Sequence, residues 1–181
     1  HDVNSTDGVI DVEGNLAAHA VTSVGGGITV DGTLTTTGAI NSDTDLTVGG
    51  TASLGGSVTT TSGFQDYNSG VTLNTNVTLT AGTTIDVAND VSGAFSLILD
   101  ADDGTTIHGT LGTNIVNVTV NDGDLTAGTI TITGDLEADN VSVTGGNLTA
   151  KTIDLSGNLA AAGHDVNSTD GVIDVEGNLA A

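Results

Sequence analysis

The chain has 181 residues and a formal net charge of −22 at pH 7, because 23 acidic residues accompany a single lysine and no arginine. It contains no Cys, Pro, Met or Trp, and its only aromatic residues are Phe64, Tyr67 and Phe95. This charge excludes a protein that binds a nucleic-acid backbone, because that task requires Lys and Arg to displace counterions. No apolar run approaches the ~20 residues of a membrane-spanning helix, so we expect no membrane insertion in this segment.

The composition favours strands over helices. Thr, Val, Asn, Asp and Gly dominate, and these residues prefer strands and turns. Apolar residues nowhere keep the 3.6-residue period of a helix over three turns. Disorder is the alternative for an acidic chain rich in Gly, Ser and Thr, but regularly spaced aliphatic pairs argue against it.

The chain begins with a segment that recurs at its other end. The residues of His1–Ala18, HDVNSTDGVIDVEGNLAA, are repeated letter for letter as His164–Ala181. Neither copy has the features of the cap that a solenoid end requires. We therefore expect residues 1–163 to form one repeat unit without end caps, and residues 164–181 to start the next identical unit of a longer protein. We expect the two copies to have the same local backbone and to be related mainly by a translation along the axis. A designed duplication in a monomer is the alternative, and a different conformation in the two copies would favour it.

From Asn15 the apolar residues recur every 18 positions. Leu16 recurs as Leu34, and Ile28 recurs as Leu46. Glycines fall between the aliphatic pairs, where a corner requires a positive φ or a close approach of two backbones. Each of these spans predicts one complete turn of a coiled, strand-rich chain.

Residues 62–70, SGFQDYNSG, interrupt this rhythm. They contain the only Tyr of the chain and one of its two Phe. An insertion in a repeat protein maps to a loop on one face. We therefore predict an interaction loop formed by Phe64, Gln65, Asp66 and Tyr67. The aliphatic pairs resume at Val71.

Two later segments, Asp100–Gly104 (DADDG) and Asn121–Asp124 (NDGD), place several carboxylates beside a glycine. We call them the acidic turns. Hard oxygen ligands of this kind suit Ca²⁺, although neither segment is an EF-hand loop. The candidate calcium ligands are Asp100, Asp102, Asp103, Asp122 and Asp124. The alternative is that these turns are simply solvated, and no cofactor is required by the sequence.

The stretch from Asp124 to Ala161 shows the pattern most clearly. Four modules each begin with a leucine that an alanine follows two positions on; the pairs are Leu125 and Ala127, Leu136 and Ala138, Leu148 and Ala150, and Leu159 and Ala161. Alternating aliphatic residues come next, as with Ile130 and Ile132. Alternation is the period of a strand, so we expect the aliphatic residues to point into the interior and the residues between them, such as Thr131, to point outward. The three-residue step from Ala127 to Ile130 then requires a corner that keeps both pairs facing inward.

One such module cannot bury its apolar side alone, so the modules must stack along the chain. This predicts an all-β parallel β-helix, or β-solenoid, with turns of about 18–23 residues. One 163-residue unit would then contain about seven to nine turns and rise about 35 to 43 Å.

The segments GDLTAGTITITG and GNLTAKTIDLSG resemble the repeats of filamentous-haemagglutinin-like exoproteins and other large bacterial tandem-repeat adhesins. The resemblance implies a right-handed β-helix that is secreted or held at the cell surface. It implies a structural role as a stalk, adhesin or matrix filament, with no catalytic residues. The expected partners are copies of the same chain end to end, with lateral self-association between shafts as a further expectation.

Two other functions are compatible with a β-helix. Polysaccharide-cleaving enzymes of similar fold use clustered Asp, and Asp43 and Asp45 or the acidic turns supply such pairs. The chain has no Arg, however, and Lys151 lies at a module bend, so we expect no enzyme. The histidines His1, His19, His108 and His164 are scattered, and we expect them to be solvated turn residues.

Ice or flat-surface binding is the second alternative. Runs such as Thr35–Thr37 and Thr59–Thr61 suggest threonine ranks on one face. The positions that align with Thr131 include Asp154 and Asp174, together with Ser142, Thr29 and Thr47. Aspartates therefore interrupt the expected rank.

Overall fold

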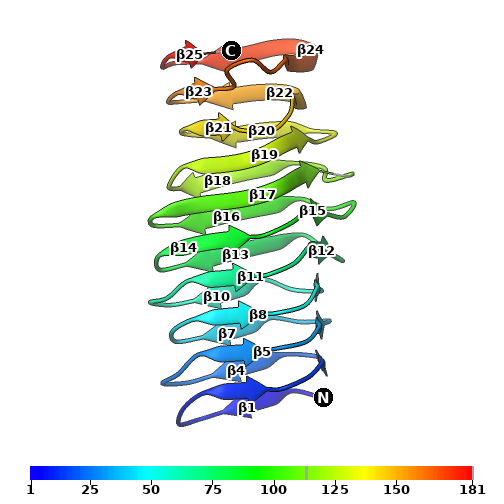
Figure 1. The fold of residues 1–181 in the computed structure, drawn as a ribbon, viewed down its shortest axis with the longest axis vertical. Coiled ribbons are helices and arrows are strands. Elements are labelled where there is room, and N and C mark those ends of the chain that lie inside the picture. The colour runs from blue at the N-terminus through cyan, green and yellow to red at the C-terminus, as the bar shows by residue number, and fades with distance from the viewer. Residues whose placement is uncertain (113, 181) are drawn as a thin grey trace.

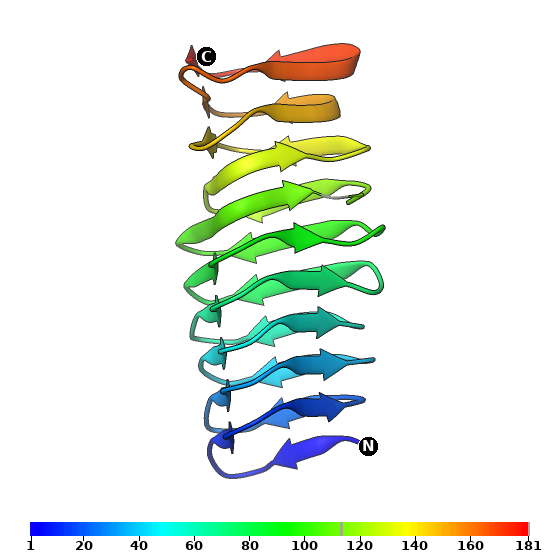
Figure 2. The same cartoon turned by 45° about the vertical axis from the view of Figure 1, so that its right-hand side comes forward.

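The computed structural model describes residues 1–112 and 114–180, and within them the chain forms strands and no helix. Strands pair in parallel with strands one turn away. The first strand, β1 (Val3–Ser5), and the last, β25 (Leu179–Ala180), lie at opposite ends of an elongated stack (Figure 1). The near strands of Figure 1 run left to right as the coil rises, and Figure 2 agrees, so the coil is right-handed. The predicted all-β right-handed parallel β-helix is confirmed.

The turns have three faces, which we number in the order in which the chain meets them. Face 1 contains β1, β4 (Val21–Ser23), β7 (Ile40–Ser42), β10 (Val58–Thr60), β13 (Val77–Ala81), β16 (Leu97–Ala101), β18 (Val118–Asp122), β20 (Asp135–Ala138) and the second halves of β22 (Leu148–Leu155) and β24 (Val166–Val175).

Face 2 contains β2 (Ile10–Val12), β5 (Ile28–Val30), β8 (Leu46–Val48), β11 (Gln65–Tyr67), β14 (Thr84–Val87), the first halves of β17 (Gly104–Gly112) and β19 (Leu125–Thr131), β21 (Val141–Val143), β23 (Leu159–Ala160) and β25. Face 3 contains β3 (Leu16–Ala18), β6 (Leu34–Thr36), β9 (Ala52–Leu54), β12 (Val71–Leu73), β15 (Val91–Ser92), the second halves of β17 and β19, and the first halves of β22 and β24.

Turn length varies along the stack. Val3 pairs with Val21, 18 residues later. The longest step between paired residues is 22, from Asp100 to Asp122 across a register shift, and the shortest is 16, from Leu125 to Val141. The described chain therefore makes about nine turns, and most of its turns fall within the predicted range of about 18–23 residues, whereas the turns that begin at Leu125 and Asp135 are slightly shorter.

The interior is a single column of mainly aliphatic side chains, with a few buried polar residues among them. Ile130 and Ile132 are buried while Thr131 between them is exposed, as the alternation predicts. The backbones of successive turns approach closely at the corners. At Gly49, a Cβ would collide with the carbonyl oxygen of Asp31 one turn away. Glycine is therefore required there for lack of space.

Asparagine side chains lock one turn to the next. Each accepts a hydrogen bond from a backbone N–H one turn further along the chain; the pairs are Asn15 with Thr33 (2.8 Å), Asn76 with Ser96 (3.0 Å), Asn117 with Asp135 (2.9 Å), Asn140 with Asn158 (2.7 Å), Asn147 with Asp165 (3.0 Å) and Asn158 with Asn178 (2.9 Å). These asparagines precede strands of all three faces. Each hydrogen bond contributes about 0.5–1.5 kcal/mol and opposes a slip in register.

The two identical 18-residue segments lie on different faces. Val3 belongs to face 1, whereas its copy Val166 pairs with Leu148 and belongs to face 3. We expected the second copy to be related to the first mainly by translation along the axis. The displacement does run along the stack (Figure 1), but a shift by one face accompanies it. The expectation of the same local backbone is also wrong, because β24 is continuous where β1 and β2 are separate, and φ is 129° at Gly8 but 78° at Gly171.

Candidate functional site

The predicted interaction loop at residues 64–67 is wrong. Residues Gln65–Tyr67 form β11 on face 2, between β8 and β14. Gln65 and Tyr67 are both fully buried. Phe64, which is 37% exposed, and Asp66 remain at the surface. Polar and aromatic residues suggested a loop, but these two occupy inward positions of an ordinary strand.

Gln65 and Tyr67 form a polar cluster inside the solenoid. The Tyr67 hydroxyl donates to Gln65 Oε1 at 3.0 Å, and Gln65 Nε2 donates to the carbonyl oxygens of Thr80 at 2.8 Å and Val58 at 3.3 Å. Burial raises the pKa of Tyr67 far above its ordinary value. The cluster is closed to solvent, so its role is structural.

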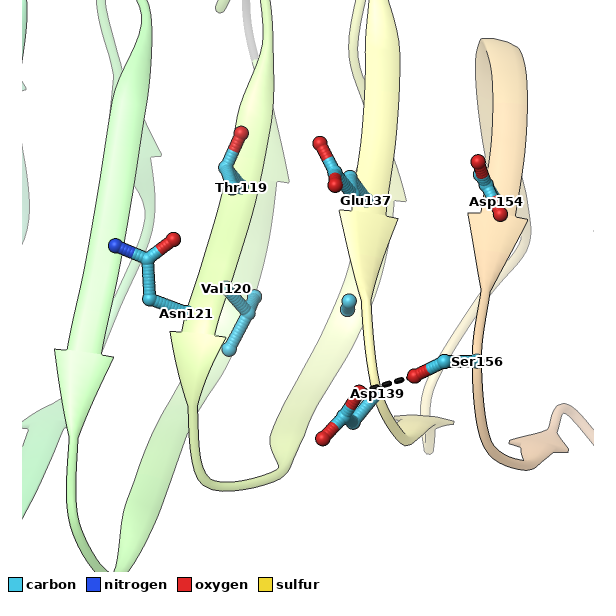
Figure 3. A pocket seen from close by; sticks show the side chains of 8 residues that line it. Thr119, Val120, Asn121, Glu137, Asp139, Asp154 and Ser156 are labelled. Carbon is cyan, nitrogen blue, oxygen red and sulfur yellow. Dashed lines mark hydrogen bonds between the residues drawn. The ribbon is translucent and has the colours of Figure 1, made fainter.

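Face 1 carries a shallow hollow near its C-terminal end (Figure 3). Glu137 and Asp154 project into it from neighbouring strands, where they are direct register partners. Asp154 pairs in turn with Asp174. The Ser156 hydroxyl donates to Asp139 at the rim (Figure 3). The hollow is open and acidic, and its aligned carboxylates repel anionic partners.

Face 2 carries a second acidic group. Asp66 and Asp86 are register partners on β11 and β14. Burial, and secondly the charge of Asp86, raise the pKa of Asp66. His108 Nε2 lies 3.3 Å from Asp86 Oδ1, and both side chains are about half exposed. This contact can offset part of the repulsion only while His108 is protonated.

The acidic turns lie one turn apart at the corner between faces 1 and 2. Asp100 pairs with Asp122 across a register shift. Asp122 accepts from the backbone N–H of Gly123 at 2.8 Å, and Asp124 accepts from the Asn140 side chain at 2.8 Å. Within residues 1–112 and 114–180, no group of three or more His, Asp or Glu is arranged to hold a metal ion. Calcium binding through Asp100, Asp102, Asp103, Asp122 and Asp124 stays a prediction.

Lys151 and the candidate carboxylate pairs lie on different corners of the coil. Lys151 sits in β22 between faces 3 and 1, with Nζ 3.6 Å from Asp170 Oδ2, and both side chains are about half exposed. Asp43 and Asp45 connect β7 of face 1 to β8 of face 2. The fold therefore does not bring the lysine to these carboxylates.

Face 3 differs from the other faces because its outward strand positions carry no charge. These positions are Ala17, Thr35, Ser53, Thr72, Ser92, Gly112, Thr131, Thr149 and Asn167. We call this row the neutral face. The corresponding rows include Asp100, Glu137, Asp154 and Asp174 on face 1, and Asp11, Asp66 and Asp86 on face 2.

The residues of the neutral face differ from those of the threonine rank that the sequence alignment suggested. The positions aligned with Thr131 in the sequence are spread over the coil: Asp154 and Asp174 lie on face 1, and Ser142 lies with Thr29 and Thr47 on face 2. The sequence pattern pairs two strands per module, whereas one turn has three. Successive modules therefore begin on different faces, and aspartates do not interrupt the row that contains Thr131.

The asparagine lock was not predicted from the sequence. Its signal is the recurring Asn before an aliphatic residue at the start of a strand, as in Asn15-Leu16, Asn140-Val141 and Asn158-Leu159.

Comparisons with protein-family models, with curated proteins and with solved structures find no match. In the described residues, no helix is long and apolar enough to cross a membrane.

Proposed function

We propose that this chain is part of an extracellular structural filament, built from near-identical tandem β-solenoid units, that serves as a stalk, adhesin or matrix fibre. The observation that carries the proposal is the exact repeat of residues 1–18 as residues 164–181, together with the way in which the second copy joins the stack. The proposal assigns no catalysis and no required cofactor to the shaft, and it places the filament at the cell surface.

The second copy packs as a further turn of the same coil. Val166, Ile173 and Leu179 pair in parallel with Leu148, Ile153 and Leu159. The backbone N–H of Asn178 donates to Asn158 Oδ1 at 2.9 Å, which extends the asparagine lock into the repeated segment. A new unit can therefore start without a linker or a change of axis, which is what a continuous tandem shaft requires.

The proposal predicts that burial within the second copy increases when a further turn is present. Ile173 is 43% exposed and Leu179 is 56% exposed, whereas their counterparts Ile10 and Leu16 are buried. A following turn would cover these side chains. Covering about half of each would contribute roughly 1 kcal/mol per residue, since full burial contributes about 1.5–3 kcal/mol.

The size of the intact native polypeptide tests the proposal. We expect a very large band or a ladder on a denaturing gel, and straight rods in electron micrographs. A recombinant chain of two complete units should form one rod about 42 Å longer than the one-unit chain, at a strand spacing of about 4.8 Å. A discrete native band near the 17.6 kDa of this chain, or two separate beads in the two-unit protein, would overturn the filament.

The neutral face favours a second candidate function, binding to ice or another flat surface. Small uncharged side chains such as Thr35, Thr72 and Thr149 form one row along the stack. A charge placed in this row by Thr72→Asp should abolish adsorption to the surface, while Thr106→Asp on face 2 should not. Equal adsorption by both variants would contradict this candidate.

A further inference from the structure

We infer that consecutive units of the tandem array are rotated by one third of a turn about the shaft, so that each unit presents its neutral face in a different one of three directions. This inference rests on the proposed tandem filament and adds the symmetry that relates its units. It follows from the faces on which the two identical segments lie.

All three strands of the repeated segment change face in the same sense. Val3 lies on face 1 and its copy Val166 on face 3; Ile10 lies on face 2 and its copy Ile173 on face 1; Leu16 lies on face 3 and its copy Leu179 on face 2. Each copy has moved back by one face. A cyclic exchange of all three strands is a rotation of the segment, because a local distortion would displace one strand only.

The number of strands per unit explains the rotation. Val3 lies on face 1 of the first turn, and Val166 lies on face 3 of the ninth turn, counted through the ladder of each face. The unit therefore contains 26 strand positions, or 8⅔ turns. A unit is one third of a turn short of nine complete turns, so the next unit starts rotated by one third of a turn. The rise per unit is about 42 Å.

The local chemistry allows the same sequence to occupy any face. Asn15 accepts from the N–H of Thr33 at the entrance to face 3. Its copy Asn178 lies at the entrance to face 2 and donates there to Asn158 Oδ1, in line with the Asn140–Asn158 contact. The inward positions of every face are mainly aliphatic and the corners are polar, so the repeated segment meets similar surroundings on each face.

The rotation determines what a partner meets along one side of the shaft. On the line where one unit shows its neutral face, the next unit shows face 1 chemistry and the third shows face 2 chemistry. The face 3 row is therefore about 42 Å long on any line and returns only after three units and 26 turns. The uncharged start of the next unit's face 1 row, from Asn4 to Thr80, lengthens the neutral segment until the position of Asp100 interrupts it. The filament offers separate neutral segments in three directions, and it cannot offer one continuous stripe to an extended flat surface.

A three-unit array with Thr72→Cys at the equivalent position of every unit tests the rotation. The cysteines are labelled with gold clusters and located by electron microscopy. We expect labels spaced about 42 Å along the rod and about 120° apart around it. Labels on one straight line would overturn the rotation while leaving the filament intact. Separate beads in place of one rod would overturn the proposed filament and the rotation together.

Two deletions provide matched variants. Deletion of residues 33–50 removes one whole turn, from the start of β6 to the end of the turn after β8, and the labels should keep their 120° offset. Deletion of residues 33–44 removes two strands and leaves eight complete turns, so the labels should fall on one line. An unchanged offset in the second variant would show that strand number does not set the rotation, and would refute the argument.

Discussion

The buried pair of Gln65 and Tyr67 allows a sharp test of the described interior. Tyr67→Phe removes the hydroxyl that donates to Gln65 Oε1 at 3.0 Å and leaves that oxygen buried without this donor. An unsatisfied buried acceptor costs about 1–3 kcal/mol. For a protein of this length we expect the melting temperature to fall by about 2–12 °C.

The double variant Gln65→Leu/Tyr67→Phe is the matched control. Leucine at position 65 continues the aliphatic column, because its register partners are Leu46 and Ile85. With both polar partners replaced, we expect a stability within about 1 kcal/mol of the original protein. The losses of stability caused by Gln65→Leu alone and by Tyr67→Phe alone should therefore be strongly non-additive.

Thermal unfolding followed by circular dichroism measures all three variants, and hydrogen exchange at β8, β11 and β14 locates the effect. Tyr67→Phe without loss of stability would show that the hydroxyl is not buried against Gln65. A double variant as unstable as the sum of the single variants would also refute the cluster. In either case, the side chains of Gln65 and Tyr67 would not point into the interior, and the register assigned to β11 would be wrong.

Asp66→Asn should stabilise the protein at neutral pH, because the raised pKa of Asp66 means that its ionised form opposes folding. This gain in stability should disappear as the pH falls towards 3.8, and a gain that persists there would contradict this cause. Burial raises the pKa of Tyr67, so stability should fall as the pH rises above 10.0, and tyrosinate absorbance should appear only on unfolding; earlier titration would place the phenol in solvent. Gly49→Ala should lower the melting temperature because its Cβ would collide with backbone, whereas Gly14→Ala, with open space around its Cβ, should not. Calcium should raise the melting temperature more than sodium chloride of equal ionic strength if the acidic turns bind it, and equal effects would refute such a site.

The sequence predicted the interior well where alternation was regular and poorly where residue type contradicted position. Ile130 and Ile132 were assigned inward from their spacing alone, and burial confirms them. Gln65 and Tyr67 have the same spacing, but a buried amide is unexpected unless its partners are known. Those partners, Thr80 and Val58, lie on other turns, so no local pattern revealed them.

The three-sided cross-section was also not predictable from the modules. Each module between residues 124 and 161 supplies two strands and one corner, which fits a coil of any even number of sides. β19 crosses from face 2 to face 3, and β22 crosses from face 3 to face 1. Only the ladder register shows that three strands close a turn, and the face assigned to each threonine and aspartate depends on that number.

The rotation between units changes how the charge of a long shaft is distributed. Within this chain many acids gather at the corner between faces 1 and 2, including Asp7, Asp43, Asp45, Asp102, Asp103, Asp124, Asp139 and Glu176, whereas the outward row of face 3 has none. A pure translation would align these corners into one acidic side and leave one neutral side, along which shafts could bundle. A third of a turn per unit gives every side the same charge over three units, so two parallel filaments meet acidic segments wherever they approach. The array would therefore repel its neighbours from all sides, and lateral contact would be confined to crossings where two neutral segments meet.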